Sequence, residues 1–236
     1  MTKKSFNLVV FAGLLFTLAI AGYYVASERS GLMIPQPSKA AEPHFLKARE
    51  LEKREKYKEA NAEFDVAIQL EEGDYYLSLY RLQRANNCLL HLNDDVCALA
   101  DFRAILKMAE SVSGGPLPSN PDLSSRMFTT FCYEKIAELD LKHGRYDEAL
   151  AYYSKLGNRY GFTYTVLEGL GDTYKAIGNK SKAALNYEQA LAALGVAASP
   201  VAMTPEPAKF QPASVMMAWA VEEATARIKA KLKEVY

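Results

Sequence analysis

Histidine and cysteine are scarce in this 236-residue chain, with three of each, and this scarcity removes most routes to catalysis. None of them falls at a His-x-x-x-His or Cys-x-x-Cys spacing, so the usual metal-ligand patterns are missing. The chain also has no Gly-x-Ser-x-Gly turn and no phosphate-binding glycine loop. We therefore expect no enzyme activity, no cofactor, no metal and no small-molecule substrate.

The chain also lacks net charge, because 28 basic residues balance 28 acidic ones. No long basic run occurs, and binding to a nucleic-acid backbone needs clustered Lys or Arg that displace counterions. We expect no nucleic acid as a partner. Half of the residues are hydrophobic (50%), which is enough for one domain with an extended helical core.

A repeat is the most informative feature that the chain does have. Residues 130–163 and 164–197 match each other at an offset of 34. Gly144 and Gly178 follow the first helical stretch of each unit, where a left-handed glycine ends a helix without steric cost. The other matched pairs are small, aromatic or aliphatic: Ile136 with Leu170, Ala137 with Gly171, Ala149 with Ala183, Tyr153 with Tyr187, and Leu156 with Ala190. The pattern predicts antiparallel helical hairpins whose helices cross closely at the small residues.

These residues resemble the tetratricopeptide repeat (TPR) family, most closely over residues 133–156 and 167–191. Two weaker units lie upstream. The first has Ala48 as its small residue and the second-helix pattern Tyr57, Ala60, Phe64 and Ala67. The second has Asn86 in place of the small residue, Asn93 in place of the turn glycine, and then Ala98, Phe102 and Ile105. The resemblance implies an all-α, right-handed solenoid of about four units, at residues 41–74, 79–112, 130–163 and 164–197.

The N-terminus predicts a membrane segment. After the basic residues 1–5, residues 6–27 are uncharged and mostly apolar, and about 20 such residues cross a bilayer as a helix. Lys3 and Lys4 come before this segment, which predicts a cytoplasmic N-terminus and an exported remainder. We expect a single-pass protein with its repeats in the bacterial periplasm, the alternative being the mitochondrial inner membrane. Ala19 and Ala21 also fit a small-x-small cleavage site, so a cleaved signal peptide is the rival interpretation.

Proline and glycine divide the rest of the chain. Residues 28–42 are predicted to form a linker, residues 43–198 the solenoid with a Gly/Pro-rich loop at 111–125, and residues 199–213 a Pro-rich connector. Residues 214–236 show apolar positions at three- and four-residue steps and are predicted to form an amphipathic capping helix, with Trp219 packed inside the cap. The alternative is that this helix docks into the groove as an internal ligand.

In the family that the repeats resemble, the first helices of the units line a concave groove. This implies the following partner-binding residues: Phe45, Arg49, Tyr80, Asn87, Phe131, Glu134, Glu138, Leu141, Glu168, Asp172 and Lys175. Four of them form a carboxylate ladder on two neighbouring helices, which favours a basic or amphipathic peptide or helix as the protein partner. The competing interpretation is an ordinary solvated helix face.

The cysteines leave two alternatives open. Cys88 and Cys97 flank a predicted hairpin turn and form either a disulfide, which an exported compartment permits, or two buried thiols. Cys132 is expected in the core.

Together these patterns predict a membrane-tethered scaffold or chaperone-like adaptor that holds a segment of another protein, in cell-envelope assembly or secretion. The alternative is a permanent structural or assembly subunit of a membrane complex.

Overall fold

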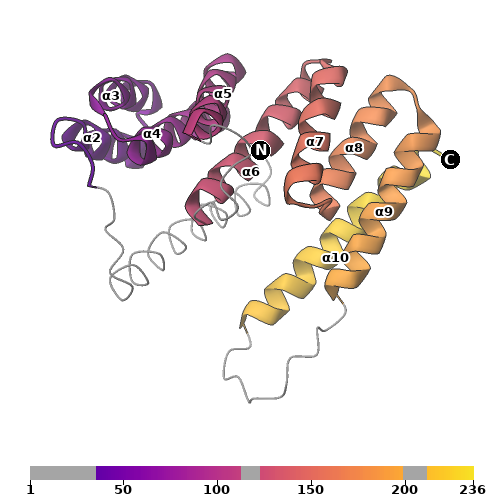
Figure 1. Cartoon of the computed structure of the whole chain (residues 1–236). Coiled ribbons are helices and arrows are strands. Elements are labelled where there is room, and N and C mark those ends of the chain that lie inside the picture. The colour runs from indigo at the N-terminus through magenta and orange to yellow at the C-terminus, as the bar shows by residue number, and fades with distance from the viewer. Residues whose placement is uncertain (1–35, 113–122, 199–211) are drawn as a thin grey trace.

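The computed structural model describes residues 36–112, 123–198 and 212–236, and every regular element within them is a helix (Figure 1). The α-helices are α2 (Glu42–Lys53), α3 (Tyr57–Leu70), α4 (Asp74–Asn87), α5 (Asp95–Val112), α6 (Leu123–Lys142), α7 (Tyr146–Tyr160), α8 (Tyr164–Ile177), α9 (Lys180–Ala198) and α10 (Pro212–Lys233). A π-helical turn, η1 (Cys88–Leu92), continues α4. The all-α prediction is thus met throughout the described part of the chain.

The membrane prediction falls on residues that the structure does not describe. Residues 1–5 and 6–27 lie wholly outside the described ranges, as do most of the linker at 28–42, most of the loop at 111–125 and most of the connector at 199–213. In the three described ranges, no helix combines the length and the apolar composition needed to cross a bilayer.

Each helix packs against the next one along the chain, which is consistent with a helical solenoid (Figure 1). The pairs α2 with α3, α4 with α5, α6 with α7 and α8 with α9 form hairpins, and α10 packs on α9. Gly144 and Gly178 take left-handed φ angles of 73° and 86° at two of the turns. In the two weaker units, Glu55 (φ 58°) and Asn93 (φ 53°) take the left-handed conformation instead. The degenerate units therefore keep the turn and lose only the glycine.

Small residues set how closely the helices approach. Ala60, Ala98, Ala149 and Ala183, the small residues of the four second helices, are completely buried. A Cβ atom placed on Gly171 would lie 2.5 Å from Cε1 of Tyr187, and one placed on Gly169 would lie 2.2 Å from Cζ of Tyr153. Each ring therefore occupies space that any larger residue on α8 would fill.

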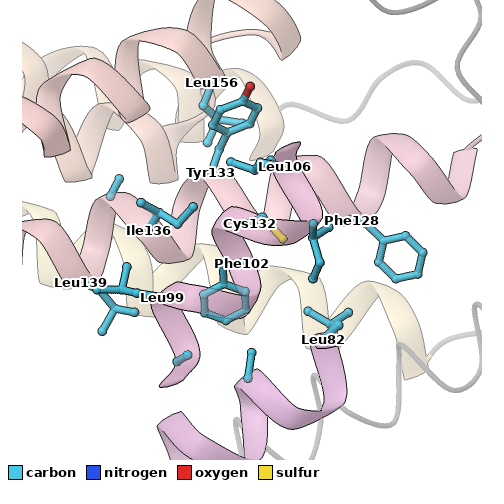
Figure 2. Packing of buried hydrophobic residues seen from close by; sticks show 14 of the residues in the cluster. Leu82, Leu99, Phe102, Leu106, Phe128, Cys132, Tyr133, Ile136, Leu139 and Leu156 are labelled. Carbon is cyan, nitrogen blue, oxygen red and sulfur yellow. The ribbon is translucent and has the colours of Figure 1, made fainter. Parts of the chain in front are cut away.

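The largest core cluster joins the second, third and fourth units. Figure 2 shows Leu99 and Phe102 of α5 lying beside Cys132 and Ile136 of α6, and the same cluster continues through Leu156 to Leu170. Cys132 is completely buried, as predicted, and burial raises the pKa of its thiol far above the usual range. The apolar core is therefore continuous from the second unit to the fourth.

The second unit departs from its prediction by one residue. Ala85, not Asn86, is the completely buried small residue of α4. The cause is η1, because a π-helical turn holds one more residue than an α-helical turn. The extra residue shifts the positions of α4 by one relative to α5. The shift turns the predicted face of α4 by about 100°.

Cys88 and Cys97 form a disulfide that closes this irregular turn, with their Cα atoms 6.0 Å apart. Cys88 is completely buried and also accepts a hydrogen bond from Nδ2 of Asn61 in α3 (2.9 Å). Of the two alternatives left by the sequence, the structure contains the disulfide. It ties the end of the first helix of the second unit to the start of its second helix.

Replacing Gly169 by alanine tests the close approach of α7 and α8. Because the buried Tyr153 ring cannot swing into solvent, we expect Gly169→Ala to lower the free energy of unfolding by about 1–3 kcal/mol. Gly195→Ala in α9 is the matched control, since a Cβ there meets nothing within 4 Å. That control should gain about 0.5–1 kcal/mol from helix propensity. Urea denaturation measures both values, and equal effects would contradict the packing argument.

Reducing the disulfide should destabilise the second unit. Closing a loop of this length removes unfolded-state entropy worth about 2–3 kcal/mol. We expect dithiothreitol to lower the urea midpoint of the wild-type chain and to leave Cys97→Ala unchanged. A midpoint that does not respond to the reductant in the wild type would show that the bond contributes nothing to stability.

Candidate functional site

Two of the predicted partner-binding residues on α4 are buried, which corrects the prediction for this unit. Tyr80 and Asn87 are each only 1% exposed. Asn87 donates through Nδ2 to the backbone oxygen of Tyr57 (2.8 Å) and to Oδ1 of Asn61 (2.5 Å), so it holds α4 against α3. Neither side chain has surface left for a partner, and the one-residue shift caused by η1 is the reason.

The predicted residues on α2 are partly accessible and already have contacts within the chain. Phe45 stacks on Tyr80 with ring centroids 4.5 Å apart. Arg49 donates through Nη1 to Oε2 of Glu52 (2.5 Å) and to Oε1 of Gln83 (3.1 Å). Arg49 therefore links the first helices of the first two units.

The third unit keeps its predicted residues together on α6. Phe131 packs edge-on against Phe102 (5.9 Å), and the ammonium of Lys135 lies 5.6 Å from the Phe131 ring centre. Lys135 also pairs with Glu138 (2.7 Å), and Leu141 is half-buried one turn further along. Glu134 is half-buried too, and no cation of the described residues lies within ion-pair distance of it. Burial, and then the charge of Glu138, raise the pKa of the Glu134 carboxyl.

The predicted residues of the fourth unit already have partners within the chain, because α10 and the residue just after it supply an oppositely charged group to each of the three. Arg227 donates through Nε and Nη2 to the two oxygens of Glu168, each at 2.8 Å. Lys231 donates to Glu168 (2.7 Å) and to Asp172 (2.6 Å). Lys175 pairs with Glu234 at the end of the same helix. The acidic face predicted for this unit is therefore neutralised from within the chain.

The electrostatics of Glu168 follow from these contacts. Its side chain is buried, and burial alone would raise its pKa, but hydrogen bonds from Arg227 and Lys231 lower it overall. Burial likewise opposes the charge on Lys231, and its two carboxylate partners nevertheless raise its pKa. The two cationic partners therefore keep the buried carboxylate of Glu168 ionised.

Helix α10 combines the two roles that the sequence left as alternatives. Its apolar face, through Ala224 and Ile228, packs on the last hairpin as a cap, together with Val235 just after the helix. Its basic residues meanwhile bind the first-helix residues of α8 as an internal ligand does. Trp219 does not pack in the cap and is 59% exposed, which corrects that prediction. It lies nine residues before Ile228, on the opposite side of a helix of about 3.6 residues per turn.

Tyr153 belongs to the site, although its place in the repeat predicted only a packing role. It is 3% exposed, and its ring lies against Gly169, which directly follows Glu168 on α8. Burial raises the pKa of Tyr153 far above its usual range, and Glu138, Glu134, Asp172 and Glu168 all raise it further. All four carboxylates of α6 and α8 therefore act electrostatically on the Tyr153 hydroxyl, which lies beside Gly169 of α8. The signal for this was Gly169 itself, a second glycine on α8 that the repeat does not require.

Arg227 and Lys231 are the other residues that sequence reasoning missed. Their signal was a pair of basic residues four apart on the amphipathic helix, which matches the four-residue spacing of Glu168 and Asp172. In the described part of the chain, no group of three or more His, Cys, Asp or Glu residues is placed to hold a metal ion.

The salt bridges of α10 should make its docking sensitive to acid. Because the folded state lowers the pKa of Glu168, the stabilisation is complete at neutral pH and is lost as the pH falls through that lowered pKa. Trp219 is the only tryptophan and lies on α10, so its fluorescence anisotropy reports the mobility of this helix. We expect the anisotropy to fall in acid, and to be reduced already at neutral pH in Arg227→Gln. Arg227→Lys should restore part of it, whereas identical anisotropy in all three proteins would contradict a role for the salt bridges.

Comparisons with known proteins add little to this picture. No family model matches the chain, and no curated protein matches it. Among solved structures, the chain is similar to PilW, described as a widely conserved type IV pilus biogenesis factor, at 16% identity and a TM-score of 0.33. The match covers 84% of this chain and 90% of that chain. The interpretation as a TPR-type helical repeat protein therefore rests on the chain's own 34-residue period and helical hairpins.

Proposed function

We propose that this chain is a helical scaffold that binds a helix or peptide of another protein on the face formed by the first helices of its units. One observation carries the proposal. The chain's own α10 is an amphipathic basic helix that is held on α8 by Arg227 and Lys231. The array thus already binds a helix through residues that the repeat pattern assigns to partner binding.

We also propose that the scaffold is tethered to a membrane, with its helices on the outer side, and acts in protein assembly or secretion at the cell envelope. The uncharged segment at residues 6–27, with Lys3 and Lys4 before it, supports this orientation. The disulfide between Cys88 and Cys97 supports it independently, because disulfides persist in oxidising compartments such as the periplasm.

Site-specific photo-crosslinking in living cells tests which face binds a partner. A photoreactive residue at Glu138, exposed on α6, should give discrete crosslinked proteins. The same residue at Glu148, an exposed glutamate on the second helix α7, and at Lys107, exposed on α5, should give none. A partner held at Glu138 is expected because the repeat pattern assigns partner binding to the first helices, whereas Glu148 and Lys107 lie on second helices. Crosslinks only from Glu148 and Lys107 would instead support the alternative of a permanent structural subunit held by its second helices.

A further inference from the structure

The four carboxylates of the predicted ladder on α6 and α8 form two equivalent pairs, and only one of the pairs is bridged by cations from another helix. Glu134 and Glu138 on α6 precede Glu168 and Asp172 on α8 by 34 residues each, so the pairs occupy the same positions in successive units. In the later pair, Lys231 bridges both carboxylates at 2.7 and 2.6 Å. In the earlier pair, Glu138 reaches only Lys135 of its own helix, and Glu134 has no cationic partner among the described residues. The third unit therefore has the same pair of carboxylates as the fourth, but no cation from another helix of the described chain bridges them.

A second observation points to a ligand at the earlier pair. The Tyr153 side chain is only 3% exposed, and its ring passes beside Gly169, the residue that follows Glu168. A Cβ on Gly169 would lie 2.6 Å from the Tyr153 hydroxyl, so only glycine leaves room for that oxygen. Within the described chain this hydroxyl has no hydrogen-bond partner, whereas the equivalent hydroxyl of Tyr187 donates to Asp172 at 2.7 Å. The hydroxyl oxygen is not among the fully buried polar atoms that lack a hydrogen bond, so a ligand can reach it and use its hydrogen-bonding capacity.

Together, Glu134, Glu138 and Tyr153 present two carboxylates and one hydroxyl oxygen. An ammonium group has three donors and no acceptor, and a guanidinium group has five donors, so either matches such a set of acceptors. In the described residues, no three His, Cys, Asp or Glu are close enough to hold a metal ion, which favours an organic cation. The half-buried Glu134 carboxylate also stands beside a like charge, and a cation would relieve both costs.

We propose that Glu134, Glu138 and Tyr153 form a subsite for a lysine or arginine side chain on a helix of the partner protein. The proposal rests on the proposed function and specifies the chemistry of the partner. The partner helix carries two basic residues four positions apart on one face, since Arg227 and Lys231 satisfy the equivalent pair with that spacing. The cation accepted by the subsite is held by carboxylates on α6, while the hydroxyl oxygen of Tyr153 accepts a further hydrogen bond from it.

Binding of a defined peptide to the full chain tests the subsite. The probe is a fluorescein-labelled, alanine-based helix with Arg and Lys four residues apart beside two leucines, and the control peptide has Glu at both basic positions. We expect the double variant Glu134→Gln with Glu138→Gln to weaken binding of the basic peptide by about tenfold or more, measured by fluorescence anisotropy. The double variant Asp147→Asn with Glu148→Gln removes two exposed charges from α7 and should change the affinity by less than about twofold.

Tyr153→Phe keeps the ring and removes only the hydroxyl, so it provides an independent test if the carboxylate variant fails to fold. It should weaken the basic peptide by about threefold or more and leave the urea midpoint unchanged. The affinity of the wild-type chain for the basic peptide should also fall as the pH is lowered from neutral. The pKa of Glu134 is raised in the folded protein, so this carboxylate loses its charge at a higher pH than an ordinary glutamate does.

Equal binding of the basic and acidic peptides, unchanged affinity in the carboxylate variant, or no binding to the wild-type chain would overturn the subsite. Partner crosslinks at Glu138 in cells, together with any of these results, would leave the scaffold function standing and remove only the cation chemistry. If no crosslinks form at Glu138 but the basic peptide binds tightly, the cation chemistry of the subsite would stand and the proposed scaffold function would be contradicted.

Discussion

The close approach of neighbouring helices at small residues is the constraint on which the rest of this structure depends. Tyr153 and Tyr187 fit only because Gly169 and Gly171 leave space on α8. With these rings in place, the charges of the carboxylates on both α6 and α8 act on the buried Tyr153. A larger side chain on α8 would separate the helices and also dissolve the acidic cluster. Packing therefore fixes the position of the charges, and the charges carry the chemistry of the site.

Most buried carboxylates of the described helices are paired with two basic residues. Asp101 is held by Arg81 and Arg84. Three other carboxylates likewise have two basic partners each: Asp95 has Lys142 and His143, Asp140 has Arg103 and Arg145, and Glu168 has Arg227 and Lys231. The buried Glu71 accepts hydrogen bonds from the backbone N–H groups of Ser38 and Gly73 instead. Since a buried charge is tolerable only when it is paired, the contacts between helices bind them to one another. Glu134 is half-buried, and no cation of the described helices forms an ion pair with it.

Periodicity made the helices predictable, because each hairpin repeats the same local packing. The buried alanines and the turn residues Gly144 and Gly178 follow from the 34-residue offset. The second unit was predicted one residue out of place because a π-helical turn leaves no mark in a hydrophobic pattern. Tyr80 and Asn87 were therefore assigned to a partner surface and are buried instead.

The candidate site was harder to predict than the fold, since its main contacts join residues that no period relates. Arg227 and Glu168 are 59 positions apart, with residues 199–211 between their helices. The sequence indicated that the last helix is basic and amphipathic, and that α8 is acidic, but it could not pair them. The prediction for Trp219 was wrong for a related reason. An aromatic residue near the apolar positions of an amphipathic helix is easily assigned to the core, but Trp219 lies on the side of α10 opposite to Ile228.

The salt bridges between α8 and α10 have a consequence for biosynthesis. The ribosome makes α8 and α9 before α10, so Glu168 remains without its cations, and the face of α9 that α10 covers stays open, until α10 has been made and has docked. During that interval the hairpins present an unpaired carboxylate beside an apolar surface that contains Tyr187 and Leu194. Chaperones and proteases act continuously on incompletely folded chains. Docking of α10 therefore ends a period in which the new chain is open to them.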